Sequence, residues 1–199
     1  MQNPNLFFST PVWTFLIDNF QSTNEDIYKY IKKLQEEDNK GIVKSNILGW
    51  HSKDFDLKNE DTIKFINKIS NKINQVMVDM DWNLNNQIAK ITNMWAIINK
   101  GGAANSRHHH GNSDISAAYY VKAPKNCGDI VFYDPRPAPV FSHPYANQPN
   151  NLNAMVNSVK PVEGCLVLFP GYLDHSVNEN LSNKERVVIS FNIKLLQKN

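Results

Sequence analysis

Three of the six histidines stand together in the sequence, and a run of this kind can bind a metal. His108, His109 and His110 lie between a glycine-containing turn and the apolar segment ISAAYYV. On an extended backbone, residues i and i+2 project to the same side, so His108 and His110 can aim both imidazoles at one point while His109 faces away. His175, after the segment GCLVLFP and the turn GYLD, can supply a third imidazole. Three neutral imidazoles in a facial arrangement suit Fe(II) and leave coordination positions open.

A cation near the end of the chain is placed to hold a second ligand. Arg186 lies eleven residues after His175 and opens the predicted last strand, RVVISFNIKLL. A charge that enters a barrel needs a partner, and a planar guanidinium suits a carboxylate better than Lys does. A dicarboxylate that chelates the metal through its 2-oxo acid end would present its far carboxylate to Arg186. Ser190, on the same strand face, can add a hydroxyl donor, and Tyr120 can add a phenol from the facing wall of the barrel.

The first half of the chain has the pattern of helices that support a sheet. Residues 7–17 are apolar, and Pro11 within them predicts an edge strand or a short extended segment. Ser22, with Glu25 three residues later, forms a capping box that predicts a helix start. A second amphipathic helix is predicted from about residue 60 to residue 80. Both helices are expected to cover the major sheet, and neither carries a predicted catalytic residue.

From Gln87 onward the hydrophobic period changes to two, which is typical of strands. In KITNMWAII, one face carries Ile91, Asn93, Trp95 and Ile97. Further strands are predicted for ISAAYYVKA, DIVFYD, NAMVNSVKP, GCLVLFP and RVVISFNIKLL, with turn residues between them. Short strands at this spacing indicate a barrel. The predicted fold is mainly β with N-terminal helices, a double-stranded β-helix of the jelly-roll, cupin-like kind.

The chain is expected to form one domain, residues 1–199. Within it, residues 1–86 would hold the N-terminal strand and the supporting helices, and residues 87–199 the β-helix core. The stretch from Pro135 to Asn153 is rich in Pro and Asn and has no periodic pattern. We expect it to form a lid over one mouth of the barrel.

Four segments resemble the 2-oxoglutarate/Fe(II) dioxygenase superfamily: STPVW, SRHHHGNSDISAAYYV, FYDPRP and VEGCLVLFPGYLDHSVNENLSNKERVVISFN. Within it the chain is most similar to a bacterial and phage family of 2OG-Fe(II) oxygenases distantly related to the prolyl hydroxylases. The resemblance covers most of the chain, and its specific motifs lie in the second half. It implies a hydroxylase that uses Fe(II), 2-oxoglutarate and dioxygen. It also implies that His108 and His175 bind iron, that Arg186 binds the far carboxylate of 2-oxoglutarate, and that Ser190 and Tyr120 assist it.

The second metal ligand departs from the usual superfamily pattern. That pattern is His-x-Asp/Glu, whereas this sequence has His-x-His, so that His110 stands where a carboxylate is usual. Asp114 is the alternative carboxylate, but it lies six residues past His108 and close to the next predicted strand. The geometry of alternate strand residues favours His110. An all-histidine triad has one negative charge less, so it would bind Fe(II) more weakly or tune it differently, and it could also accept Zn or another metal.

The composition restricts the setting of this activity. A net charge of +2 over 199 residues, without a Lys/Arg cluster, argues against a nucleic-acid-binding surface. No apolar run is long enough for a bilayer, no signal peptide is evident, and two cysteines make no disulfide framework, so we expect a cytoplasmic protein. The substrate, small molecule or peptidyl, is open, and a homodimer is possible. His51 and His143 are expected to be surface or loop residues.

Two other functions are consistent with parts of the sequence. A cupin-type metalloenzyme that does not use 2-oxoglutarate would explain the histidines but gives Arg186 and Ser190 no role. A non-catalytic barrel that serves as a binding module would hold no stoichiometric metal. Measuring the affinity for 2-oxoglutarate would distinguish the proposed oxygenase from the cupin-type enzyme. Elemental analysis for bound metal would distinguish it from the binding module.

Overall fold

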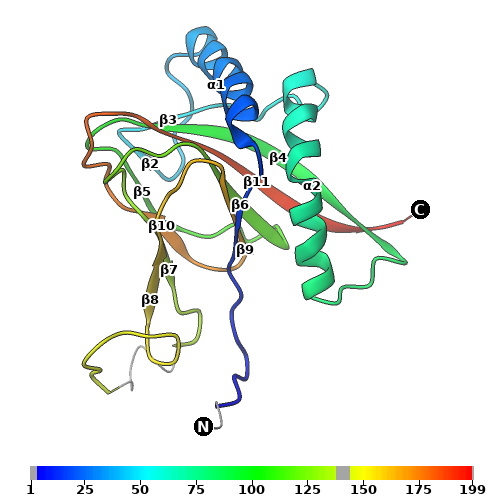
Figure 1. Cartoon of the computed structure of the whole chain (residues 1–199), viewed down its shortest axis with the longest axis vertical. Coiled ribbons are helices and arrows are strands. Elements are labelled where there is room, and N and C mark those ends of the chain that lie inside the picture. Colours follow the sequence, from blue (N-terminus) through cyan, green and yellow to red (C-terminus); the bar gives the residue numbers. More distant parts are fainter. Residues whose placement is uncertain (1–3, 138–143, 199) are drawn as a thin grey trace.

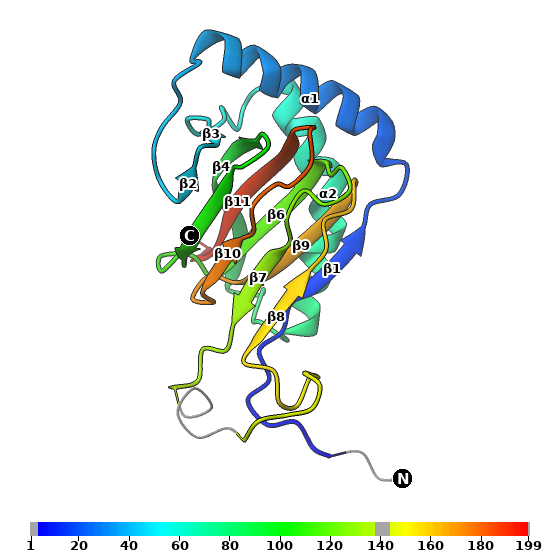
Figure 2. The same cartoon turned by 90° about the vertical axis from the view of Figure 1, so that its left-hand side faces the viewer.

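The computed structural model describes residues 4–137 and 144–198, which form two facing antiparallel sheets (Figures 1 and 2). The six-stranded sheet has, in spatial order, β1 (Trp13–Leu16), β9 (Cys165–Pro170), β6 (Ile115–Lys122), β11 (Arg186–Gln197), β4 (Gln87–Asn99) and β3 (Trp50–His51). The five-stranded sheet has β2 (Asn46–Ile47), β5 (Ala104–His108), β10 (His175–Val177), β7 (Ile130–Tyr133) and β8 (Val156–Val159). This is the double-stranded β-helix predicted from the spacing of the strands.

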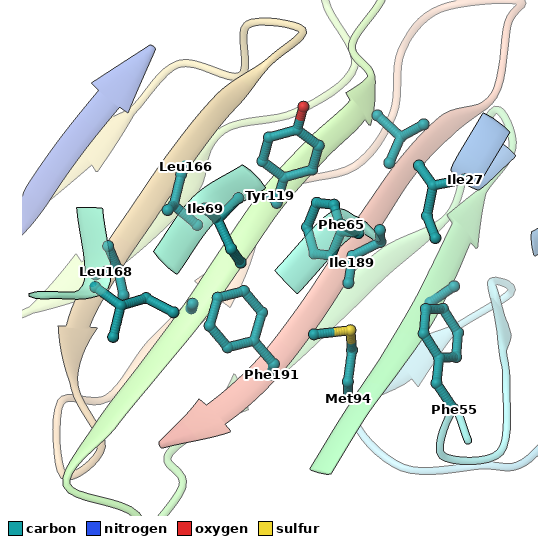
Figure 3. Packing of buried hydrophobic residues seen from close by; sticks show 14 of the residues in the cluster. Ile27, Phe55, Phe65, Ile69, Met94, Tyr119, Leu166, Leu168, Ile189 and Phe191 are labelled. Carbon is teal, nitrogen blue, oxygen red and sulfur yellow. The ribbon is translucent and has the colours of Figure 1, made fainter. Parts of the chain in front are cut away.

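Two helices cover the outer face of the six-stranded sheet, as the sequence predicts. They are α1 (Phe20–Glu37) and α2 (Glu60–Asp79), and Figures 1 and 2 show both on the side of this sheet that faces away from the other. Figure 3 shows the core between the helices and the six-stranded sheet. Phe65 and Ile69 of α2 pack there against Tyr119, Leu166 and other strand residues. The helices therefore bury the outer face of this sheet.

The strand alternation divides β11 into two faces with different roles. Val187, Ile189 and Phe191 face the helices in the outer core. Arg186, Val188, Ser190 and Asn192 face the space between the sheets. On β4, Asn93, Trp95 and Ile97 share the inner face as predicted. The prediction that Ile91 joins them is wrong: a bulge in the pairing with β11 makes Thr92 an extra residue, and Ile91 packs against the outer core instead.

The start of α1 differs from the prediction. The helix begins at Phe20 after Asn19, whose left-handed backbone has φ 49°, and no side chain caps it. Ser22 and Glu25 therefore lie inside the helix, and the predicted capping box is wrong. Phe20 explains the earlier start, because its ring lies so close to Gly164 that a Cβ there would come within 2.3 Å of it. This tertiary contact, with the Ile17 amide donating to the Gly164 carbonyl at 2.9 Å, outweighs the local signal.

Residues 1–86 contribute more than one strand to the sheets. Besides β1, they supply β2 and β3, two-residue strands that pair with β5 and β4 respectively. Such short strands carry too little pattern to be seen in the sequence. Among the described residues, no helix has the length and hydrophobicity that a bilayer crossing requires.

Replacing Asn24 with alanine is expected to lower the free energy of unfolding by about 3 kcal/mol, because two buried polar groups would lose their partner. The Asn24 amide nitrogen donates to the Val121 carbonyl at 2.9 Å, and its oxygen accepts from the Tyr119 hydroxyl at 2.6 Å, which ties α1 to β6. Urea unfolding would measure the change. The control is Asn74→Ala on the exposed side of α2, for which we expect a change below about 0.5 kcal/mol. Equal effects of the two changes would contradict the role of Asn24.

Candidate metal and 2-oxo acid site

A cavity of about 760 Å³ lies between the two sheets and contains the predicted site residues. Its lining includes all three predicted metal-binding histidines together with the other predicted residues, which are Arg186, Ser190 and Tyr120. Apolar side chains surround them, among them Ile130, Phe169 and Val188. A mainly apolar cavity with a few convergent polar groups is typical of a small-molecule site.

The structure brings three histidines from distant parts of the chain together. One nitrogen from each of His108, His110 and His175 lies within 4.8 Å of the others. His108 ends β5 and His175 begins β10, and these two residues are direct partners in the antiparallel ladder. His110 lies two residues beyond β5, where its amide donates to the Gly171 carbonyl at 2.8 Å. His109 is exposed, as the alternation predicts.

Hydrogen bonds to the backbone fix which nitrogen of two histidines is free. Nδ1 of His108 lies 2.8 Å from the Ser106 carbonyl oxygen, and Nδ1 of His175 lies 3.0 Å from the Leu173 carbonyl oxygen. A carbonyl oxygen only accepts, so both Nδ1 atoms carry the proton and both Nε2 atoms keep a lone pair. This is the usual way in which a protein orients an imidazole for a metal.

The environment also keeps the triad uncharged near neutral pH. Burial, with smaller contributions from His175 and His108, lowers the pKa of His110 to about 3. Burial and the neighbouring His108 lower the pKa of His175 to about 4. The pKa of His108 is lowered as well, mainly by burial. Neutral imidazoles do not have to lose a proton before they bind a metal, so the donor set fits a divalent cation such as Fe(II).

The metal-free protein is expected to lose stability as the pH falls from about 6.5 toward 4. The unfolded chain protonates its histidines near pH 6.5, whereas folded His110 and His175 stay neutral to about pH 4. The unfolded state then binds more protons, and the free energy of unfolding falls by up to about 1.4 kcal/mol per pH unit for each histidine. Urea unfolding at several pH values would measure this slope. His175→Gln removes one of these histidines, so it should reduce the slope by up to about 1.4 kcal/mol per pH unit. An unchanged slope would contradict the expectation.

Arg186 is buried in the same cavity without a carboxylate partner. Its side chain and backbone are only 1% exposed, and Nη1 donates to the carbonyl oxygens of Cys127 at 2.6 Å and Gly128 at 2.8 Å. It forms no ion pair with any residue in the described ranges. Burial lowers its pKa below the usual arginine value, but an arginine remains charged at neutral pH. A carboxylate on a bound ligand would supply the partner that such a buried charge needs.

Comparison with known proteins decides the family. The sequence profile of the family described as "Putative 2OG-Fe(II) oxygenase" matches residues 93–192, half of the chain and nearly the whole span from β4 to β11. The chain belongs to this 2OG-Fe(II) oxygenase family. It is therefore an enzyme of the 2-oxoglutarate- and Fe(II)-dependent dioxygenases, as the motifs imply. No curated protein sequence matches the chain.

Solved structures show the same fold at low sequence identity. A prolyl-4-hydroxylase from Pseudomonas putida has a TM-score of 0.64 at 13% identity, covering 96% of this chain and 95% of that one. A prolyl hydroxylase from Trichoplax adhaerens, solved with a hypoxia inducible factor peptide fragment, has a TM-score of 0.61 at 14% identity, covering 92% and 83%. HygX from Streptomyces hygroscopicus, solved with nickel and 2-oxoglutarate, has a TM-score of 0.63 at 10% identity, covering 93% and 83%.

Tyr120 and Ser190 line the same cavity as Arg186 in this oxygenase, and all three lie on one sheet. Tyr120 on β6 pairs with Val188 on β11, so its phenol reaches the cavity from the neighbouring strand, and the prediction of a facing wall is wrong. Burial raises the pKa of Tyr120, which keeps the hydroxyl protonated as a donor. Tyr119 points to the opposite face, into the outer core. Ser190 lines the same cavity, two residues along the inner face from Val188.

Asp114 does not join the histidines of the oxygenase site. Its carboxylate accepts a hydrogen bond from the Leu195 amide at 2.7 Å. The Asp114 side chain is therefore engaged near the C-terminal end of β11. The described residues that could hold a metal ion are His108, His110 and His175. The structure therefore favours His110 over Asp114 as the second ligand.

The imidazole of His110 stacks against two neighbouring rings. Trp95 lies 5.7 Å from His110 with an interplanar angle of 19°, and His175 lies 5.2 Å away at 9°. Trp95 also stacks with His51, with ring centroids 5.6 Å apart and an interplanar angle of 7°. The prediction that His51 is a surface residue is wrong, because it is 6% exposed and lines the cavity. His51 lies there because it pairs with Ile97 of β4, and this long-range pairing cannot be read from the sequence.

The predicted lid is only partly described. His143 and residues 138–143 lie outside the described residues. The described flanks line a second hollow together with residues 5–10 near the N-terminus, and the flanking residues in it are 134–136, 151–152 and 154–155. None of these flanking residues lines the oxygenase cavity. The flanks thus give no support to a lid, which stays a prediction.

Proposed function

We propose that His108, His110 and His175 hold the Fe(II) of this oxygenase, and that Arg186 holds the far carboxylate of 2-oxoglutarate. One observation carries the proposal: a buried guanidinium without a carboxylate partner lies in the same cavity as three converging neutral imidazoles. Tyr120 and Ser190 add hydroxyl donors to that carboxylate. These residues bring the two reactants together, which is the main task of a protein around a reactive cofactor.

The proposed reaction is the hydroxylation of a C–H bond. Dioxygen supplies one oxygen atom to the substrate, R–H, and the other to 2-oxoglutarate, so that the products are R–OH, succinate and carbon dioxide. Bound Fe(II) supplies the redox chemistry of this exchange. The protein orients 2-oxoglutarate through Arg186, and the apolar walls at Ile130, Val188 and Phe169 exclude water from its carbon chain.

Turnover of 2-oxoglutarate is the direct test. The protein should be purified without oxygen, loaded with Fe(II), and supplied with oxygen and 2-oxoglutarate labelled with ¹⁴C at the 1-carboxylate. We expect slow release of labelled carbon dioxide with an equal amount of succinate, and neither product with His175→Ala. A protein that binds iron but not 2-oxoglutarate would be a cupin-type metalloenzyme, and one without stoichiometric metal would be a binding module.

We also propose a cytoplasmic protein that acts on a small-molecule or peptidyl substrate and binds neither nucleic acid nor membrane. The cavity of about 760 Å³ has room for a small molecule or one side chain of a peptide. Both cysteines, Cys127 and Cys165, are free and buried, which suits a reducing compartment. The open edge of β1 would permit a homodimer, which sedimentation analysis would detect.

A further inference from the structure

Ser45 lies against the histidine triad, although no motif in the sequence marks it. It precedes β2 and lines the cavity. Its carbonyl accepts from the Ser106 amide at 2.8 Å and from the Ser106 hydroxyl at 3.2 Å, which fixes the backbone of Ser45 beside β5. Its hydroxyl oxygen lies 3.4 Å from Nε2 of His108. The side chain is thus next to the very atom that His108 offers to a metal.

The neighbouring amides determine where the Ser45 hydroxyl hydrogen points. The side-chain oxygen of buried Asn105 accepts from the Asn99 amide at 3.0 Å, so the NH₂ group of Asn105 faces Ser45. That NH₂ group donates to the Ser45 oxygen at 3.2 Å. The Ser45 oxygen therefore acts as the acceptor in this contact and still has its own hydrogen to donate. The lone pair on Nε2 of His108 is the acceptor within reach.

Metal binding at His108 takes that acceptor away. Once the lone pair of Nε2 is bound to a cation, the Ser45 hydroxyl needs a new acceptor, because an unpaired polar group in a cavity is costly. The atom that the metal holds next to His108 is then the nearest candidate. A hydroxyl donor at this place favours a ligand atom with negative charge.

Charge in the site points to the same kind of ligand. Three neutral imidazoles add no charge, so Fe(II) and the 2-oxoglutarate dianion together have a net charge of zero. A site with a carboxylate ligand would have a net charge of −1, and a small monovalent anion restores this value. Lys44, next to Ser45, also lines the cavity and forms no ion pair within the described ranges. Lys53 and Asp54 line the cavity as well, and together with Lys44 their formal charges sum to +1, which favours an anion in the cavity.

We propose that Ser45 donates a hydrogen bond to a small monovalent anion held at the metal beside His108. Three imidazoles and a chelating 2-oxoglutarate leave one position on a six-coordinate metal, so this anion would compete there with dioxygen. The inference rests on the proposed metal site. It gives Ser45 a direct binding role and gives the Asn105–Asn99 pair a positioning role. The ligand class is a compact anion with one charge, for which azide is a suitable probe.

Azide titration of the Co(II)-loaded, full-length protein tests the site. Visible absorption of Co(II) reports both metal binding and the exchange of a ligand on it. We expect wild type to bind azide, and Ser45→Ala to weaken azide binding about tenfold while Co(II) binds no more weakly than before. Ser45→Thr and Ser45→Val form a matched pair of equal shape. Thr keeps the hydroxyl and should bind azide like wild type within about twofold, whereas Val should resemble Ala.

The outcomes separate this inference from the proposed function. If wild type binds Co(II) and turns over 2-oxoglutarate with Fe(II), but azide binds equally to the Thr and Val variants, only the anion site is wrong. If azide does not bind Co(II) in wild type, the anion site is also wrong. If wild type binds no Co(II), both proposals fail. A circular dichroism spectrum and a melting curve for each variant verify that it is folded.

Discussion

Arg186→Met is expected to weaken the binding of 2-oxoglutarate by a factor of about 100 or more without loss of the metal. Removing one partner of a buried, hydrogen-bonded charge pair costs about 2–5 kcal/mol, and about 2.7 kcal/mol corresponds to a factor of 100. Calorimetric titration of 2-oxoglutarate into the Co(II)-loaded protein would measure the change. Because Arg186 also donates to the carbonyls of Cys127 and Gly128, the variant should unfold at a lower temperature than wild type.

Two further variants make this measurement specific. Arg186→Lys keeps the charge but loses the planar fork, so we expect an affinity between those of wild type and Arg186→Met. Arg136→Met removes an exposed arginine that pairs with Asp134 at 2.8 Å outside the cavity, and it should leave the affinity within about twofold. If folded Arg186→Met bound 2-oxoglutarate as wild type does, the assigned carboxylate site would be wrong.

Several site residues that the sequence predicts lie on long strands. Alternation along β4 and β11 places Trp95, Arg186 and Ser190 on one face, and β11 is long enough for the pattern to be read with certainty. Where the backbone departs from regular alternation, prediction fails. The bulge at Thr92 turns Ile91 outward, and it depends on the pairing of two strands almost 100 residues apart.

The parts that the sequence misses come from short segments whose position is set by tertiary contacts. Ser45 and His51 lie next to two-residue strands or within them, in a stretch with no periodicity. Their places in the cavity depend on pairing with β5 and β4. His51 could have been found only by asking which residue stacks on Trp95, and that question needs coordinates. The helix start at Phe20 was missed for a similar reason, because its packing against Gly164 is non-local.

His110→Ala is expected to lower the affinity for Co(II) or Fe(II) at least 100-fold and to abolish turnover of 2-oxoglutarate. Losing a residue that only hydrogen-bonds to a metal ligand lowers metal affinity about 10–100-fold. Losing a ligand itself should lower the affinity by at least about 100-fold. Competition with a chromophoric chelator would measure the affinity. Asp114→Asn is the matched control, because the Asp114 carboxylate accepts from the Leu195 amide and is not part of the triad. A larger metal defect in Asp114→Asn than in His110→Ala would assign the second ligand to Asp114.

His110→Asp then tests why this oxygenase has three imidazoles. The change restores the His-x-Asp pattern and adds one negative charge to the site, so Fe(II) should bind more tightly than in His110→Ala, provided that the shorter side chain reaches the metal. The same charge should disfavour a second anion, so azide should bind the Co(II) form of His110→Asp more weakly than it binds wild type. Tight metal binding with undiminished azide affinity would show that the anion is selected by the Ser45 hydroxyl alone. The charge balance of the triad would then have no part in that selection.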